Sequence, residues 1–216
     1  MFLGRENVVS LSIYQNETVM NQDEIRALAE ANAAEAHRVL DESGIAEAWR
    51  AAGCRVNLVG SMRMGLMAAH RDIDLHVYSS GVTEANSFAV AAKIAADPAV
   101  TEIKCINGLH TDEHCVAWHF MYKADSGEVW QIDVIHIEEG SRYDGYFELM
   151  ADRIMAVVSP QQRDMILKLK FESQAECGFH GVEYYEAVIA DSVSSVEELK
   201  RWVVAHREKP PYYWIP

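Results

Sequence analysis

Basic residues, proline and glycine are scarce in this sequence. Across 216 residues, 19 Lys and Arg stand against 33 Asp and Glu, and the formal net charge is −14 with the histidines neutral. A field of this sign repels phosphate backbones, so it argues against a broad nucleic-acid surface and against an anionic membrane as partners. It leaves room for a local basic pocket that binds one nucleotide. With only five prolines and twelve glycines, collagen-like and long disordered architectures are excluded.

Closely spaced cysteines and long apolar runs are missing as well. The four cysteines form no Cys-x-x-Cys pair, which argues against a zinc ribbon or a disulfide framework and for reduced thiols; they are Cys54, Cys105, Cys115 and Cys177. No apolar run approaches the roughly 20 residues that cross a bilayer. The first residues also lack the charged and apolar segments of a secretory signal. We therefore expect a soluble, cytoplasmic protein with no membrane partner.

What the sequence does have is a change of hydrophobic period along the chain. Asn21, with Glu24 in the capping-box position, starts a helix whose apolar residues recur at helical spacing. Strands and one alanine-rich helix over 84–96 follow, and the last two strands are expected to pair as a hairpin. The predicted strands cover 55–59, 72–78, 101–106, 115–122 and 129–137. After Gly140 the pattern is helical, over 141–158, 161–176, 182–190 and 196–206.

These periods predict an α+β fold, in which a mixed β-sheet is flanked by helices and followed by a helical C-terminal section. Three parts are expected along the chain. An N-terminal lead-in covers residues 1–20 and includes one short predicted strand at 8–14. The sheet-bearing domain covers residues 21–140. The helical section, with a tail rich in proline and aromatic residues, covers residues 141–216.

A Gly-Ser pair follows the first predicted strand. Leu58 and Val59 lead into Gly60 and Ser61, which we interpret as a turn. Glycine lets the backbone approach a ligand closely, and exposed N–H groups beside a hydroxyl suit a phosphate. Taken alone, this pair fits an ordinary structural turn just as well.

Acidic residues on two later predicted strands give a stronger indication of a functional site. Asp72 and Asp74 alternate with apolar residues, so both lie on one face of a strand, about 6–7 Å apart. Two such carboxylates can converge on a pair of cations, although a solvated acidic edge strand is the alternative. Asp133 interrupts an otherwise apolar strand, where a carboxylate needs a metal, a proton or a basic partner. Few basic residues lie nearby in the sequence, which favours a metal.

In their order and spacing these features resemble the signature of the DNA polymerase β-like nucleotidyltransferase superfamily. The matching stretches are VGSMRMGLMAAHRDIDLHVY and QIDVIH, within residues 55–137. The resemblance implies a Mg²⁺-dependent transfer of a nucleoside monophosphate from a nucleoside triphosphate (NTP) to a hydroxyl acceptor. It implies that Gly60 and Ser61 hold the β- and γ-phosphates. Asp72, Asp74 and Asp133 would be the catalytic residues and would bind two Mg²⁺ ions, or Mn²⁺ in their place.

Basic residues that could contact the triphosphate are fewer. Arg63 and Arg71 flank the Gly-Ser pair and the acidic strand, and a solvated surface position is the alternative for each. Lys170 lies on the predicted helix after Pro160, seven residues from Arg163 and on the same helical face. A zinc site at His110, His114, Cys115 and His119 is disfavoured, because these residues span a loop entering a strand and no second pair completes them.

The acceptor and two other functions stay open. The charge favours a small hydroxylated molecule or a protein hydroxyl over a polynucleotide as the acceptor. A non-catalytic binding module of the same fold, acting on a protein partner as antitoxin-like relatives do, is a second hypothesis. The presence of all three acids argues against it. A metal-dependent phosphohydrolase is a third, but it leaves the Gly-Ser pair without a role. A homodimer is compatible with each of these functions.

Overall fold

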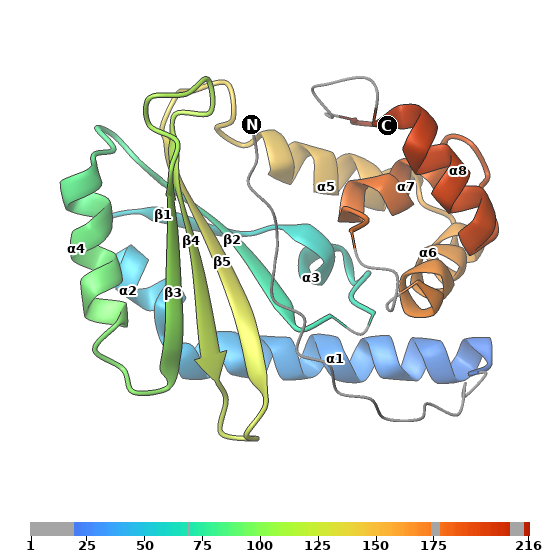
Figure 1. Cartoon of the computed structure of the whole chain (residues 1–216), viewed down its shortest axis with the longest axis horizontal. Coiled ribbons are helices and arrows are strands. Elements are labelled where there is room, and N and C mark those ends of the chain that lie inside the picture. The colour runs from blue at the N-terminus through green and yellow to red at the C-terminus, as the bar shows by residue number, and fades with distance from the viewer. Residues whose placement is uncertain (1–19, 69, 174–177, 208–213) are drawn as a thin grey trace.

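The computed structural model describes residues 20–68, 70–173, 178–207 and 214–216 of the chain (Figure 1). The strand predicted at 8–14, nearly all of the lead-in, Cys177 and most of the proline-rich tail lie outside these residues. The division of the chain at residues 20 and 140 stays a prediction.

The described residues form a five-stranded mixed sheet, as the alternating pattern predicted. Its order is β1-β2-β5-β4-β3, with β2 and β5 parallel and the other neighbours antiparallel. The predicted hairpin is therefore the antiparallel pair β4 and β5. The strands are β1 (Arg55–Leu58), β2 (Asp72–Ser79), β3 (Val100–Asn107), β4 (Cys115–Lys123) and β5 (Val129–Glu138).

Helices cover the sheet and form a second core beside it. Side chains of α1, α2 and α4 pack with the strands in one hydrophobic core. The other core joins the N-terminal part of α1 to α5, α6, α7 and α8, and Figure 1 shows α1 running beneath both groups. The helices are α1 (Gln22–Ser43), α2 (Ile45–Ala51), α3 (Gly60–Met64), α4 (Glu84–Ile94), α5 (Tyr146–Val157), α6 (Pro160–Glu172), α7 (Gly181–Ile189) and α8 (Val196–His206). Within the described residues, no helix combines the length and apolar character of a bilayer span.

The predicted N-terminal cap of the first helix is confirmed. The side chain of Asn21 accepts hydrogen bonds from the backbone N–H groups of Asp23 and Glu24, at 3.0 and 3.1 Å. In return the Glu24 carboxylate accepts from the Asn21 backbone at 2.8 Å. This reciprocal pair satisfies backbone donors that a helix start leaves free.

Two local predictions were wrong. Gly60 and Ser61 open the short helix α3 and do not form a turn, since the chain continues helically as far as Met64. The first C-terminal helix, α5, begins at Tyr146 and not at residue 141. Gly140 and Gly145 both adopt a φ of +74°, which a right-handed helix does not accommodate, so the intervening residues form turns.

The sheet separates an apolar face from a polar one along β2. Ile73, Leu75 and Val77 are buried in the core with α1, α2 and α4. Asp72 and Asp74 point to the opposite face because side chains alternate along a strand. Parallel pairing with β5 places Asp74 directly beside Asp133. The register thus gathers the predicted acids on one face of two neighbouring strands.

Leu75→Ala tests the apolar face. Leu75 is 1% exposed, so truncation should lower the free energy of unfolding by about 2–5 kcal/mol in a denaturant titration. Val204→Ala is the control, because Val204 on α8 is 70% exposed and should change stability little. Equal effects of the two substitutions would contradict the placement of Leu75 in the core.

Candidate active site

A cleft of about 900 Å³ lies where β2, the start of α3 and the C-terminal helices meet. Six of the eight predicted site residues line it: Gly60, Ser61, Arg71, Asp72, Asp74 and Lys170. Asp133 lies next to the cleft, because it is the register partner of Asp74 on β5. The structure therefore brings most of the predicted residues together, and their function as a site stays a prediction.

Asp74 is the most perturbed carboxyl group of the cleft. Its burial raises its pKa to about 7, and the neighbouring charges of Asp72 and Asp133 add to the rise. Lys170 and His119 oppose this effect. Three carboxylates held this close repel one another, so a cation or a proton stabilises the group.

Gly60 allows the backbone of α3 to contact that carboxylate. Its φ is +66°, and a Cβ atom built at this position would lie 1.9 Å from Asp74 Oδ2. Ser61, the next residue, is buried in the cleft wall. The strand β1 therefore leads directly into the start of α3, which places its backbone against Asp74, an approach that only glycine permits at residue 60.

Lys170 is the buried cation of the cleft. Its Nζ donates hydrogen bonds to the backbone oxygen of Leu66 at 2.9 Å and to Tyr185 Oη at 3.2 Å. Burial lowers its pKa, while the charges of Asp72 and Asp74 act in the opposite direction. Lys170 thus belongs to the same electrostatic group as the two carboxylates, which the sequence alone did not indicate.

The two predicted arginines differ in their surroundings. Arg71 lines the cleft and forms an ion pair with Glu128 at the start of the β5 hairpin. Arg63 lies on α3 but is directed away from the cleft, where its Nη2 pairs with Asp152 Oδ1 of α5 at 2.6 Å. The structure therefore brings Arg71 to the site and does not bring Arg63 there.

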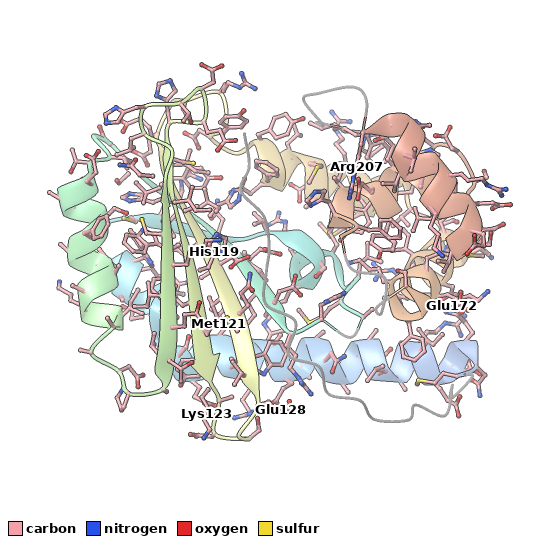
Figure 2. The ribbon with its side chains drawn as sticks, in the orientation of Figure 1. His119, Met121, Lys123, Glu128, Glu172 and Arg207 are labelled. Carbon is pink, nitrogen blue, oxygen red and sulfur yellow. The ribbon has the colours of Figure 1, made fainter. Side chains whose placement is uncertain are left out.

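Two further residues hold Asp133, and the sequence analysis assigned neither of them to this site. Asp133 Oδ1 accepts a hydrogen bond from His119 Nδ1 at 2.7 Å. The amide of Gln131 donates to both carboxylate oxygens at 2.9 Å. Gln131 precedes Asp133 by two residues on the same strand face, so the period of a strand could have identified it. His119 lies on β4 (Figure 2), and only the strand pairing reveals its contact.

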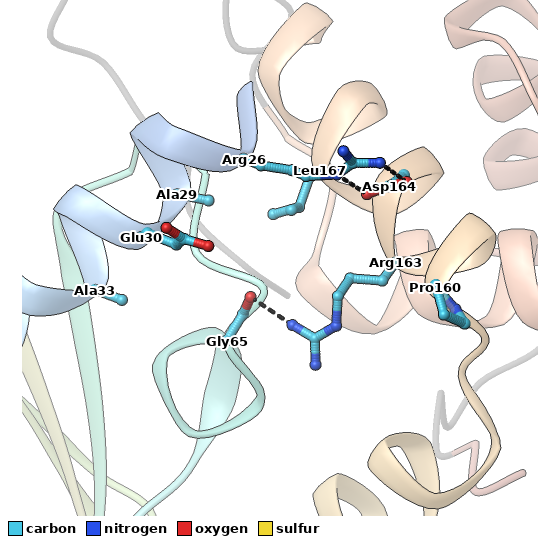
Figure 3. Close-up of a pocket in the computed structure, with 9 residues that line it drawn as sticks. All are labelled: Arg26, Ala29, Glu30, Ala33, Gly65, Pro160, Arg163, Asp164 and Leu167. Carbon is cyan, nitrogen blue, oxygen red and sulfur yellow. Dashed lines mark hydrogen bonds and ion pairs between the residues drawn. The ribbon is translucent and has the colours of Figure 1, made fainter. Parts of the chain in front are cut away.

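Helix α6 holds the connection that follows α3. Arg163 Nη1 donates to the backbone oxygen of Gly65 (Figure 3), and Nη2 donates to that of Met64, both at 2.9 Å. With the Lys170 bond to Leu66, three consecutive carbonyl groups are bound by one helical face. The predicted common face of Arg163 and Lys170 therefore contacts the end of α3 and the residues that follow it, and it joins α6 to this part of the chain.

The donor set of the cleft fits a hard divalent cation. Asp72 Oδ1 is buried and has no hydrogen-bond partner, and Asp74 is buried beside two other acids. Among the described residues, no three His, Cys, Asp or Glu side chains are gathered closely enough to hold a metal ion by themselves. Mg²⁺ commonly takes one or two protein carboxylates and completes its shell with water and substrate phosphates. Carboxylate oxygens also suit Mn²⁺.

Gly60→Ala tests the close approach to Asp74. The Cβ atom must displace the carboxylate, so we expect a loss of cation or nucleotide binding, read from the thermal shift with Mg²⁺ and NTP. Gly44→Ala is a matched control, since its φ of +61° is similar and no atom lies within 4 Å of the added Cβ. Both substitutions should cost about 1–2 kcal/mol of backbone strain. A full ligand shift in Gly60→Ala would contradict the proposed contact.

Asp74→Asn tests the raised pKa. Between pH 4 and 7 the native carboxyl stays protonated while the unfolded chain ionises, so the wild type loses stability as the pH rises. Without divalent cations, the variant should be more stable than the wild type at pH 8, by on the order of 2–4 kcal/mol. The difference should shrink toward pH 4 in denaturant titrations. Parallel pH profiles would contradict this assignment, and Asp112→Asn, an exposed loop substitution, supplies the control.

Comparison with known proteins supports the fold. No family model and no curated protein sequence matches this chain. Among solved structures, a cytoplasmic RNA terminal U-transferase is 14% identical with a TM-score of 0.55, covering 77% of this chain and 48% of its own. The Cid1 poly(U) polymerase with MgGTP is 14% identical with a TM-score of 0.58, covering 77% and 53%.

A third structure extends further along the chain. The polymerase core of TRAMP, an RNA surveillance complex, is 16% identical with a TM-score of 0.51, covering 87% of this chain and 64% of its own. The chain thus spans between about half and just under two thirds of the length of these proteins. Identities this low establish architecture alone, and the chain therefore shares the fold of these transferase and polymerase structures.

Proposed function

We propose that this protein is a nucleotidyltransferase, which transfers a nucleoside monophosphate from an NTP to a hydroxyl acceptor and releases pyrophosphate. The observation that carries this proposal is the register of β2 and β5, which aligns Asp74 with Asp133 beside the backbone of Gly60. Carboxylates beside a closely approaching backbone suit a polyanionic substrate, because the carboxylates bind the divalent cations that accompany such a substrate. The fold agrees with this chemistry.

Each residue of the cleft has a role in this proposal. The N–H groups of Gly60 and Ser61, with the Ser61 hydroxyl, would bind the β- and γ-phosphates. Asp72, Asp74 and Asp133 would hold two Mg²⁺ or Mn²⁺ ions. When bound, such ions neutralise the leaving pyrophosphate and favour deprotonation of the attacking hydroxyl. Asp133, on the strand beyond Asp74, would orient the acceptor and take up its proton.

Two basic residues would contact the phosphates of the substrate. Lys170 is buried next to Asp72 and Asp74, and it would compensate phosphate charge as the substrate enters. Arg71 lies at the cleft and would release Glu128 to contact the triphosphate. Arg63, paired with Asp152, has no such role.

The acceptor is proposed to be a small hydroxylated molecule or a protein side chain, because the net charge of −14 disfavours extended contact with nucleic acid. RNA is the second candidate. It is suggested by similarity to proteins described as an RNA terminal U-transferase and as part of an RNA surveillance complex. A cytoplasmic location, a homodimer and a protein partner stay predictions.

Thermal unfolding with each of the four NTPs and Mg²⁺ tests donor binding. A ligand at about 100 times its Kd adds about 2.7 kcal/mol of stability, which raises Tm by several degrees. We expect a Mg²⁺-dependent shift with at least one NTP. No shift with any NTP, from folded protein, would favour a binding module over an enzyme.

Asp74→Asn should abolish transfer of a labelled α-phosphate while the fold is retained, because it removes one of the carboxylates that face the cation. The assay offers the NTP identified above with an RNA oligonucleotide, a polyhydroxylated small molecule and a protein extract as separate acceptors. Asp112→Asn should keep wild-type activity, since Asp112 is exposed in the loop between β3 and β4. Label release without an acceptor product would indicate a phosphohydrolase instead.

A further inference from the structure

The three acids of the cleft differ in how the protein holds them. Asp72 Oδ1 is buried and has no hydrogen-bond partner among the described residues. Asp133 by contrast accepts hydrogen bonds from two side chains, His119 and Gln131. Asp72 thus keeps a carboxylate oxygen available for a ligand, whereas the carboxylate of Asp133 is held by the protein.

The position of each donor follows from the sheet. His119 on β4 is the register partner of Asp133 across the antiparallel pair, so both side chains rise from the same face. Asp74 on β2 is the register partner on the other side. Since β5 lies between β4 and β2, the imidazole binds the carboxylate from the edge opposite Asp74. The His119 and Asp133 side chains are 27% and 19% exposed, so the pair is largely shielded from solvent.

We propose that His119 is a positioning residue for Asp133. Together with Gln131 it would fix the rotation of the carboxylate, so that the remaining lone pairs stay directed toward the Asp74 side, where a cation would bind. This inference rests on the proposed function, because it assigns Asp133 to the divalent ion on the acceptor side. An aspartate χ2 torsion is soft, with a broad distribution. Two donors from different strands restrict it at little cost, because a carboxylate has lone-pair positions for both donors and for a cation.

The hydrogen bond matters more than the ring in this arrangement. Nδ1 is the third atom from Cα in histidine, and the amide nitrogen of asparagine occupies the same place along its side chain. His119→Asn should therefore preserve the donor to Asp133, whereas His119→Leu removes it. Loss of an outer-shell donor commonly lowers metal affinity or activity by about 10- to 100-fold.

A purely structural pair would behave differently. The β4 and β5 backbones are already joined by a ladder from Cys115 to Lys123, so the side-chain bond is not required to pair them. If His119 only stabilised the sheet, both substitutions would lower stability and leave the affinity for the cation unchanged. Met121→Leu is the matched control, because Met121 lies two residues further on β4 and on the same face (Figure 2).

The test is direct binding of Mn²⁺ alone to the full chain, followed by its paramagnetic signal, with transfer kinetics measured in parallel. We expect His119→Leu to weaken Mn²⁺ binding and to lower kcat by about 10- to 100-fold, with little change in KM for the NTP. His119→Asn should restore both values to within a few-fold of the wild type, and Met121→Leu should change neither.

The outcomes separate the two proposals. Wild-type Mn²⁺ affinity and kcat in folded His119→Leu would overturn the positioning role and leave the nucleotidyltransferase proposal intact. Failure of His119→Asn to restore the values would also overturn it. Absence of Mn²⁺ binding and of transfer in the wild type would overturn both proposals. If His119→Leu does not fold, Gln131→Leu removes the other donor without altering β4, and unchanged Mn²⁺ affinity there would contradict the shared role.

Discussion

The parallel pairing of β2 with β5 is the constraint on which the rest of the site depends. Because side chains alternate along a strand, a shift of one residue would move Asp133 to the apolar face, away from Asp74. The register is fixed from the other side of the sheet, where Ile73 and Leu75 of β2 pack in one core with Ile132 and Val134 of β5. The buried core of the sheet thus sets the positions of the polar groups, although none of these four residues lines the cleft.

That arrangement concentrates negative charge at a buried place. Asp74 has a raised pKa because water is excluded and two acids lie beside it, and the single buried ammonium of Lys170 compensates only part of this charge. In the proposed function, divalent cations are needed between the carboxylates of this acidic chain and the negatively charged triphosphate. The same carboxylates that destabilise the empty cleft would attract those cations, so the electrostatic cost in the free protein becomes a favourable interaction in the loaded one.

The parts of this structure that the sequence could predict are those whose signal lies within a few neighbouring residues. Alternation along β2, the Asn21 cap and the helical spacing after Gly140 all involve residues within one element, and each gave the right type of element. Ser61 was placed in a turn because a five-residue helix has no period to detect. Arg63 was a candidate for phosphate contact because its partner, Asp152, lies far along the chain and could not be identified from the sequence. His119 likewise contacts Asp133 only through the strand pairing. Contacts of this kind depend on tertiary structure, which local patterns do not encode.

The C-terminal helices complete the cleft and do not merely follow it. Helix α1 contributes Ala36 and Val39 to the core beneath the sheet and Ile25 and Ala29 to the core of the C-terminal helices, so it connects the two. Helix α6 then reaches back to the loop after α3 and inserts Lys170 beside the acids. The cleft is therefore lined by residues from both regions. Movement between the two regions would displace Lys170 relative to Gly60 and Asp74, so binding of a ligand that contacts all three would be coupled to the packing of α6.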